Sequence, residues 1–266
     1  MPDFNVCAAV REKRPLVHCI SNIVTANDCA NILYAFGASP MMAEACEEMA
    51  EISALADAAV LNTGTPSDAR YEAARICLEE SRRLEKPVVL DPVGVGASSW
   101  RLERVLRLLE SGAPDILRVN LAEAEALLGL GSAELGVDSP GRTDRTARAS
   151  AAKLLSRQLG CVVLLTGEFD AVSDGERCAV VSGGSALMPL ITGSGCMLSA
   201  VCGAFAAVED AFSAALDASL QWKRCSELAE QACAGRGPGS LRAALMDAAH
   251  VLWHPLTPPA AQPEWL

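Results

Sequence analysis

Short apolar runs alternate with longer segments of helical periodicity along most of this chain. The runs are three to five residues long and most are rich in β-branched residues, which is typical of buried parallel strands. The predicted strands are residues 58–61, 88–90, 116–119, 162–165 and 187–191. The predicted helices are residues 66–84, 101–110, 121–128 and 144–159. The alternation predicts an α/β fold with a mainly parallel central sheet.

The pattern changes in the second half of the chain. Two short alternating runs within residues 170–181 flank Asp174-Gly175, which predicts a β-hairpin at an antiparallel edge of the sheet. From Cys196 to about His250 the pattern is helical, with an interruption at residues 235–239. We therefore expect one domain over residues 1–253 and an irregular, proline-rich tail over residues 254–266.

Composition restricts the class of partner. The 266 residues are 51% apolar and 21% charged, enough for a globular domain with helices on both faces of a sheet. The net charge of −11 argues against a nucleic-acid partner, which would need clustered Lys and Arg. Neither a membrane span nor a signal peptide is indicated, so we expect a cytoplasmic protein that acts on small molecules. Eleven cysteines without a C-x-x-C pair indicate neither a disulfide framework nor a zinc site, and we expect most of them in the core.

Residues 192–196, Thr-Gly-Ser-Gly-Cys, link an apolar run to an apolar helical segment. Two glycines let the backbone approach a ligand, and the free amides of the next helix would point at it. We expect Gly193, Ser194 and Gly195 to form an anion hole that suits a phosphoryl group. The positive end of the helix would also lower the pKa of the Cys196 thiol. The alternative is a tight turn with a buried cysteine.

Polar residues also follow the predicted strands, where ligands bind in open parallel sheets. Arg118 precedes an N-x-x-E element in which Asn120 can cap a helix and Glu123 can complete a capping box. The functional alternative is that Arg118 clamps a polyphosphate while Glu123 holds Mg²⁺, with Asp91 as a second metal ligand. For Asp91 the structural alternative is a loop-capping carboxylate. Walker and Rossmann glycine signatures are absent from the sequence.

These motifs, in this order, resemble hydroxyethylthiazole kinase, the thiamine-pathway family of the ribokinase-like superfamily. The resemblance covers nearly the whole chain. One departure is Val119, which stands where the family's motif has a glycine between Arg and Asn. The matching blocks are residues 15–22, 37–43, 91–94, 166–168, 192–196 and 237–240. Asn27 and Asn31 lie between the first two blocks, and Glu47 and Glu48 follow the second.

The resemblance implies a three-layer α/β/α fold and ATP-dependent phosphorylation of the primary alcohol of 4-methyl-5-(2-hydroxyethyl)thiazole, with Mg²⁺ as cofactor. It places Cys196 at the catalytic position, where most ribokinase-like enzymes have an aspartate. It also implies a homotrimer with shared active sites. The stretch from Tyr34 to Ala45 fits an interface, because it brings residues 34–36 close to Met41 and Met42 as one apolar surface. Assigned to the thiazole are Met42, Gly193 and Asn22, and to ATP Arg118, Thr166 and Asn120.

Two alternatives remain open. One is a pyridoxal or hydroxymethylpyrimidine kinase of the same superfamily, although Cys196 and the block at residues 15–42 argue against it. The other is a ligand-binding module without catalytic activity, because a fold does not fix a function. His18 could contact the substrate, but a single histidine between apolar neighbours is more often structural.

Overall fold

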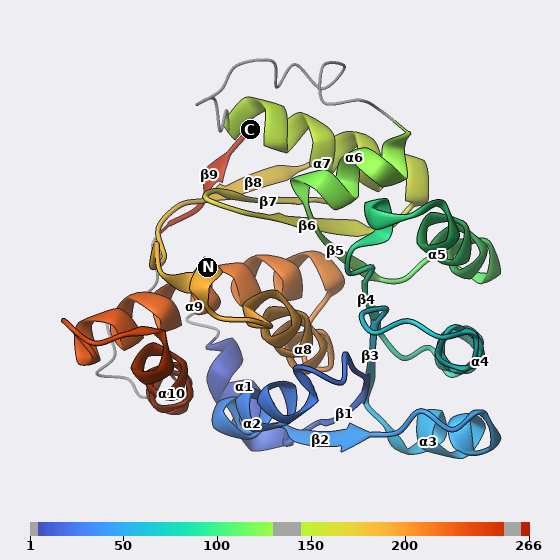
Figure 1. Cartoon of the computed structure of the whole chain (residues 1–266), viewed down its shortest axis with the longest axis horizontal. Helices are drawn as coiled ribbons and strands as arrows, with labels where there is room; N and C mark the ends of the chain where they lie inside the picture. Colours follow the sequence, from blue (N-terminus) through green and yellow to red (C-terminus); the bar gives the residue numbers. More distant parts are fainter. Residues whose placement is uncertain (1–4, 130–144, 253–261) are drawn as a thin grey trace.

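One sheet forms the centre of the molecule. The computed structural model describes residues 5–129, 145–252 and 262–266, and in them nine strands pair in the order β2-β1-β3-β4-β5-β6-β7-β8-β9 (Figure 1). Strands β1 to β6 are parallel, and β7, β8 and β9 are antiparallel. The strands are β1 Leu16–Ile20, β2 Ser39–Met42, β3 Ala58–Asn62, β4 Val88–Asp91, β5 Ile116–Asn120, β6 Val162–Thr166, β7 Asp170–Ser173, β8 Cys178–Val181 and β9 Glu264–Trp265.

Helices cover both faces of this sheet, which confirms the three-layer α/β/α prediction (Figure 1). One layer holds α1 Val6–Lys13, α2 Ala26–Phe36, α8 Ser194–Ala206, α9 Ala211–Ala232 and α10 Pro238–Val251. The other layer holds α3 Met49–Leu55, α4 Asp68–Arg83, α5 Ser99–Ser111, α6 Leu121–Leu128 and α7 Arg145–Leu159. Successive strand residues point to opposite faces, so Leu164 packs in the first core and Leu165 in the second. Both faces of the parallel strands are therefore apolar, as their sequence pattern indicates.

Helix α8 lies directly on the middle of the sheet. Every residue from Cys196 to Ala206 is buried, and a side chain at Gly203 would collide with Val60 of β3. This close approach holds the helix in one position, with its N-terminus at the carboxyl ends of the strands.

Two predictions about local structure are wrong. Residues 187–191 are not a strand, because Met188–Leu190 form a short 3-10 helix (η3). Pro189 cannot donate a ladder hydrogen bond, and Leu190 is 63% exposed, so this apolar run lacks the burial of a central strand. The tail is not wholly irregular either, because β9 pairs with β8 along the antiparallel edge. Residues 254–261 of that tail lie outside the described residues.

The remaining elements match the expected pattern closely. The hairpin of β7 and β8 turns at Asp174-Gly175, and Gly175 has a φ of +95°. Strands β1 and β2 were not predicted from periodicity, although their residues belong to the first two blocks of the resemblance. All eleven cysteines are free, and all but Cys46 are buried, as core residues should be. Among the described helices, none combines the length and the apolarity that a membrane span needs.

Candidate functional site

The carboxyl ends of β3, β4, β5 and β6 meet the N-terminus of α8. Asn62 and Asp91 are the last residues of β3 and β4 and are register partners. Arg118 lies in β5, and Thr166 ends β6. Parallel pairing brings these side chains together along the carboxyl ends of the strands, as the sequence predicted. This side of the sheet is the ligand edge.

Asp91 is fully buried beneath this edge. Its Oδ2 accepts hydrogen bonds from Asn62 Nδ2 at 3.0 Å and from Ser199 Oγ at 2.7 Å. Its Oδ1 lies 3.5 Å from Arg118 Nη1, and no donor of the described residues forms a hydrogen bond with it. Burial raises the pKa of Asp91, the positive charge of Arg118 lowers it, and the negative charge of Glu123 raises it further.

Arg118 connects the end of β4 to the end of β6. One guanidinium nitrogen donates to Thr166 Oγ1 at 2.6 Å, and the other faces Asp91. Burial by itself would lower the pKa of Arg118, but the charges of Asp91 and Glu123 outweigh it, so the net shift is upward. The guanidinium is therefore charged, and Thr166 and Asp91 orient it.

The start of α8 lies against that guanidinium. A side chain at Gly195 would approach the Arg118 guanidinium carbon to 2.7 Å, so only glycine lets the two pack together. Gly193 caps the helix with a φ of +85° and lies against Thr25. The amide of Ser194 already donates to Ile191 O at 3.2 Å, so the helix-start amides left for an anion are those of Gly195 and Cys196.

Cys196 lies in the first turn of α8 and is 8% exposed. The expected lowering of its pKa is wrong. Burial is the largest effect and raises the pKa of the thiol, and the charge of Asp91 raises it as well. Hydrogen bonding with Thr25 and Asn62 and the charge of Arg118 oppose this shift without reversing it. The side chain is therefore a neutral thiol near pH 7.

The capping-box interpretation of Asn120 and Glu123 is confirmed. Asn120 Oδ1 accepts from the Glu123 amide and Glu123 Oε2 accepts from the Asn120 amide, both at 2.9 Å. Glu123 Oε1 also accepts from the Gly94 amide at 2.9 Å, which links α6 to the loop after β4. Both carboxylate oxygens thus have a structural role.

The donor set still suits a magnesium ion. Within the described residues, no three His, Cys, Asp or Glu side chains are grouped as a metal site. Mg²⁺ is commonly held by only one or two carboxylates, with phosphate and water oxygens as the other ligands. The unbonded Oδ1 of buried Asp91 and the remaining lone pairs of Glu123 fit that requirement.

The residues assigned to the substrate lie beside this edge. Met42 ends β2, is 40% exposed, and has its sulfur 3.9 Å from Ser21 Oγ. Asn22 Oδ1 accepts from the Val24 amide at 3.0 Å in the loop after β1. Thr25, which ends this loop, contacts Gly193 and so joins the loop to the start of α8.

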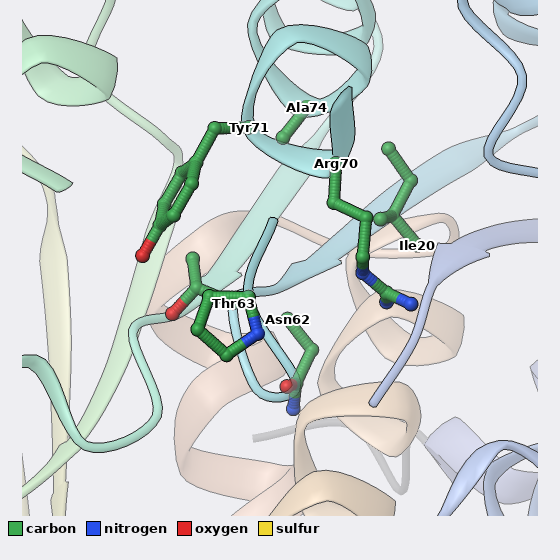
Figure 2. A pocket seen from close by; sticks show the side chains of 7 residues that line it. Ile20, Asn62, Thr63, Arg70, Tyr71 and Ala74 are labelled. Carbon is green, nitrogen blue, oxygen red and sulfur yellow. The ribbon is translucent and has the colours of Figure 1, made fainter. Parts of the chain in front are cut away.

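Arg70 of α4 holds the loops after β1 and β2 together. It donates to Ser21 O and pairs with Glu44 Oε2 at 2.8 Å. Figure 2 shows it reaching from α4 beside a small cavity of about 10 Å³, room for one water. Tyr71 and Thr63 line the same cavity.

His18 is structural, because it is fully buried with both ring nitrogens partnered by Ala43 O and Cys77 Sγ. Sequence reasoning missed Thr25, Ser199 and Arg70 as parts of the edge. Only Ser199 carried a signal, since it lies three residues after Cys196 and thus on the same helix face.

Comparison with known proteins agrees with this geometry. The model of the "Hydroxyethylthiazole kinase family" matches residues 7–254. A hydroxyethylthiazole kinase of Listeria monocytogenes serotype 4a is 46% identical over 250 residues, which cover 93% of this chain and 92% of that protein. One from Thermoanaerobacter sp. is 41% identical over 239 residues, or 90% of each chain.

Solved structures give the same result. A hydroxyethylthiazole kinase structure from Pyrococcus horikoshii OT3 superimposes with a TM-score of 0.87 at 36% identity, covering 98% of this chain and 97% of that one. The Staphylococcus aureus pyridoxal kinase in complex with ADP has a TM-score of 0.60 at 15% identity over 80% of this chain and 87% of that one, which shows a shared fold only. The chain belongs to the hydroxyethylthiazole kinase family.

Proposed function

We propose that this protein transfers the γ-phosphoryl group of ATP to the primary alcohol of 4-methyl-5-(2-hydroxyethyl)thiazole, in the cytoplasm. Family membership supports the substrates. The observation that carries the chemistry is the packing of the Arg118 guanidinium against Gly195, one residue before Cys196. A fixed cation, helix-start amides and a thiol are thus adjacent.

Phosphoryl transfer asks a protein mainly for positioning and for stabilisation of negative charge. Arg118 and the amides of Gly195 and Cys196 supply positive potential, and the packing of Arg118 against Gly195 fixes their relative positions. Thr166 and Asn120 complete the ATP side at the ends of β6 and β5. The Cys196 side chain orients the substrate hydroxyl, and in its thiolate form it accepts the hydroxyl proton. The alcohol oxygen then bonds to the γ-phosphorus as the bond from that phosphorus to the oxygen of ADP breaks.

Asp91 and Glu123 are the residues that would hold Mg²⁺. When bound, this ion would neutralise charge on the ATP phosphates. Asp91 is well suited because its Oδ2 is fixed by Asn62 and Ser199, which leaves Oδ1 in a defined place. Met42, Asn22 and Gly193 are the residues that we assign to the thiazole.

We expect purified protein with ATP and Mg²⁺ to phosphorylate the thiazole alcohol, and pyridoxal and hydroxymethylpyrimidine much more slowly. Family membership and the thiol at position 196 are the reasons. Mass spectrometry of the products from the three alcohols, each tested alone, measures the preference. Faster turnover of either rival, or ATP hydrolysis that does not depend on the thiazole, would contradict the proposal.

We also propose a homotrimer in which neighbouring chains complete each site. Exposed apolar side chains surround the substrate side, with Ile23 at 73%, Val24 at 65% and Met42 at 40% exposure. The expected Tyr34 to Met42 surface needs correction, because Phe36 is in the core against Phe205. Tyr34 is near the C-terminal end of α2, away from the substrate side. The exposed apolar rim formed by Ile23, Val24 and Met42 is therefore the better candidate interface.

Sedimentation should accordingly give three times the chain mass of 27.8 kDa. Replacing Val24 with glutamate is expected to dissociate the assembly and abolish turnover together, because it places a charge in a desolvated contact. Leu55→Glu is the matched control, since Leu55 is similarly exposed at 66% but ends α3, away from this rim. A fully active monomer would refute the shared site.

A further inference from the structure

Lys223 is a buried cation that lies outside the residues assigned so far. It projects from α9 and is 8% exposed. Its ammonium lies 3.4 Å from Gly167 O, 3.3 Å from Glu168 O and 3.3 Å from Gly183 O. It also lies 3.4 Å from Asp170 Oδ1. Few side chains are buried with a full charge unless partners compensate them, and here three backbone carbonyls and a carboxylate do so.

These partners come from two different turns. The turn at residues 166–168 begins with Thr166, the last residue of β6, and Gly183 follows β8. An ammonium has three N–H donors, so one such group can bond to carbonyls of two separate turns at the same time. The ammonium of Lys223 therefore connects the two turns, and both are tied to α9.

The first of these turns is the one that carries Thr166. Its hydroxyl accepts from Arg118 Nη2 at 2.6 Å, so the position of the turn determines where this hydroxyl and the guanidinium meet. Arg148 of α7 contacts the turn from the other helical layer, donating to Thr166 O at 3.3 Å. A side chain at Gly167 would collide with that guanidinium. One buried cation from each layer thus holds the turn.

We propose that Lys223 is a positioning residue for the nucleotide, acting through the turn at residues 166–168. The inference rests on the proposed function for its assignment of Thr166 to ATP. Lysine suits this role because the three donors of its compact ammonium point in different directions, whereas the donors of arginine lie in one plane. Asp170 fixes the ammonium, and is itself fixed by the Gly167 amide and by Ser219.

The test is Lys223→Met, which keeps the length of the side chain and removes the charge and the donors. The dissociation constant of a non-hydrolysable ATP analogue, measured by calorimetry with Mg²⁺, should rise at least about tenfold, the effect of losing charged hydrogen bonds. The dissociation constant of the thiazole alcohol without nucleotide should stay within about twofold. Amide hydrogen exchange should become faster at residues 166–168 and 183–185.

Lys153→Met is the matched control, because it also removes one positive charge. Within the described residues, the hydrogen bond of Lys153 is to Leu266 O, away from the turn at residues 166–168. This variant should leave both affinities unchanged. If Lys223→Met does not fold, Lys223→Gln serves instead, since its amide still donates to the carbonyls. It should bind nucleotide more weakly than the wild type.

Unchanged nucleotide affinity in the folded variant would overturn the inference. Equal weakening of nucleotide and thiazole binding would overturn it too, because that pattern reflects general loosening of the fold. Calorimetry needs no turnover. A wild type that binds the analogue but does not phosphorylate the thiazole would therefore refute the proposed function and leave the role of Lys223 tested separately.

Discussion

Replacing Cys196 with alanine is expected to lower kcat by roughly 10²- to 10⁴-fold, the usual range for a group that transfers a proton. The thiol lies in the first turn of α8 beside Asn62 and Thr25, where it can orient the substrate hydroxyl. Stability should change little, because the small cavity left by one sulfur is at the ligand edge. Steady-state kinetics and thermal melting of the same preparations measure both quantities.

Cys196→Asp separates a catalytic from a packing role. Under the catalytic hypothesis it should retain substantial activity, since a carboxylate can accept the same proton and Arg118 compensates its charge. If Cys196 is only a packing residue, aspartate would be the worse substitution, because it buries a charge. Alanine would then change activity and stability very little. That inverted order, in activity and melting temperature together, would rule out the catalytic role.

The pH dependence gives a further readout for the wild type. Burial raises the pKa of Cys196 above its usual value of 9.0, so the thiol is protonated at neutral pH. If the residue accepts a proton during transfer, kcat should increase as pH rises toward that range. Cys196→Ala should lack this increase.

Replacing Arg118 with methionine is expected to cost about 3–5 kcal/mol of unfolding free energy, because it leaves buried Asp91 without its cation. Nucleotide affinity should fall as well, while thiazole affinity without nucleotide should change much less. Urea unfolding and calorimetry measure the two effects. Arg107→Met is the control: its pair with Glu103 is exposed, so its loss should cost less than about 1 kcal/mol.

The stability loss in Arg118→Met should depend on pH with a defined sign. Burial already raises the pKa of Asp91, and loss of the guanidinium raises it further. When a carboxyl has a higher pKa in the folded state than in the unfolded state, the protein loses stability as pH rises from the unfolded value to the folded value. The deficit should therefore be larger at pH 8 than at pH 5.

Adding Asp91→Asn to Arg118→Met should recover stability, because it removes the uncompensated charge. It should not recover nucleotide binding, which needs the guanidinium itself. Recovery of both would show that Arg118 acts only as the counter-ion of Asp91, and would refute its assignment to ATP.

Much of the fold was predictable from local pattern. Buried parallel strands are apolar on both faces, so β3, β4, β5 and β6 appear as continuous β-branched runs. Asp174-Gly175 marked the antiparallel hairpin for an equally local reason, since its turn needs a residue with positive φ. The run at residues 187–191 was misleading, because apolar content alone does not specify burial.

The chemistry of the edge was visible in sequence only as separate motifs. Asp91 and Thr166 end strands, and Cys196 lies in the first turn of a helix. Arg118 lies two residues before the end of β5, and parallel-sheet topology brings all four to the same side. The metal role of Asp91 and the polyphosphate role of Arg118 were expected from residue type and spacing. The assignment of Thr166 to ATP and of Cys196 to catalysis came from the resemblance, and direct binding and activity measurements remain the test of both.

The sequence by itself determined the layers, the order of the motifs and the edge at which they meet, because hydrophobic periodicity and turn residues act over short distances. Only the tertiary structure decided the protonation of Cys196 and the partners of Lys223. Both depend on desolvation and on groups distant in sequence: Asp91 beside Cys196, and Gly167 with Gly183 around Lys223. Such electrostatic environments arise when separate elements pack, and no local pattern encodes them.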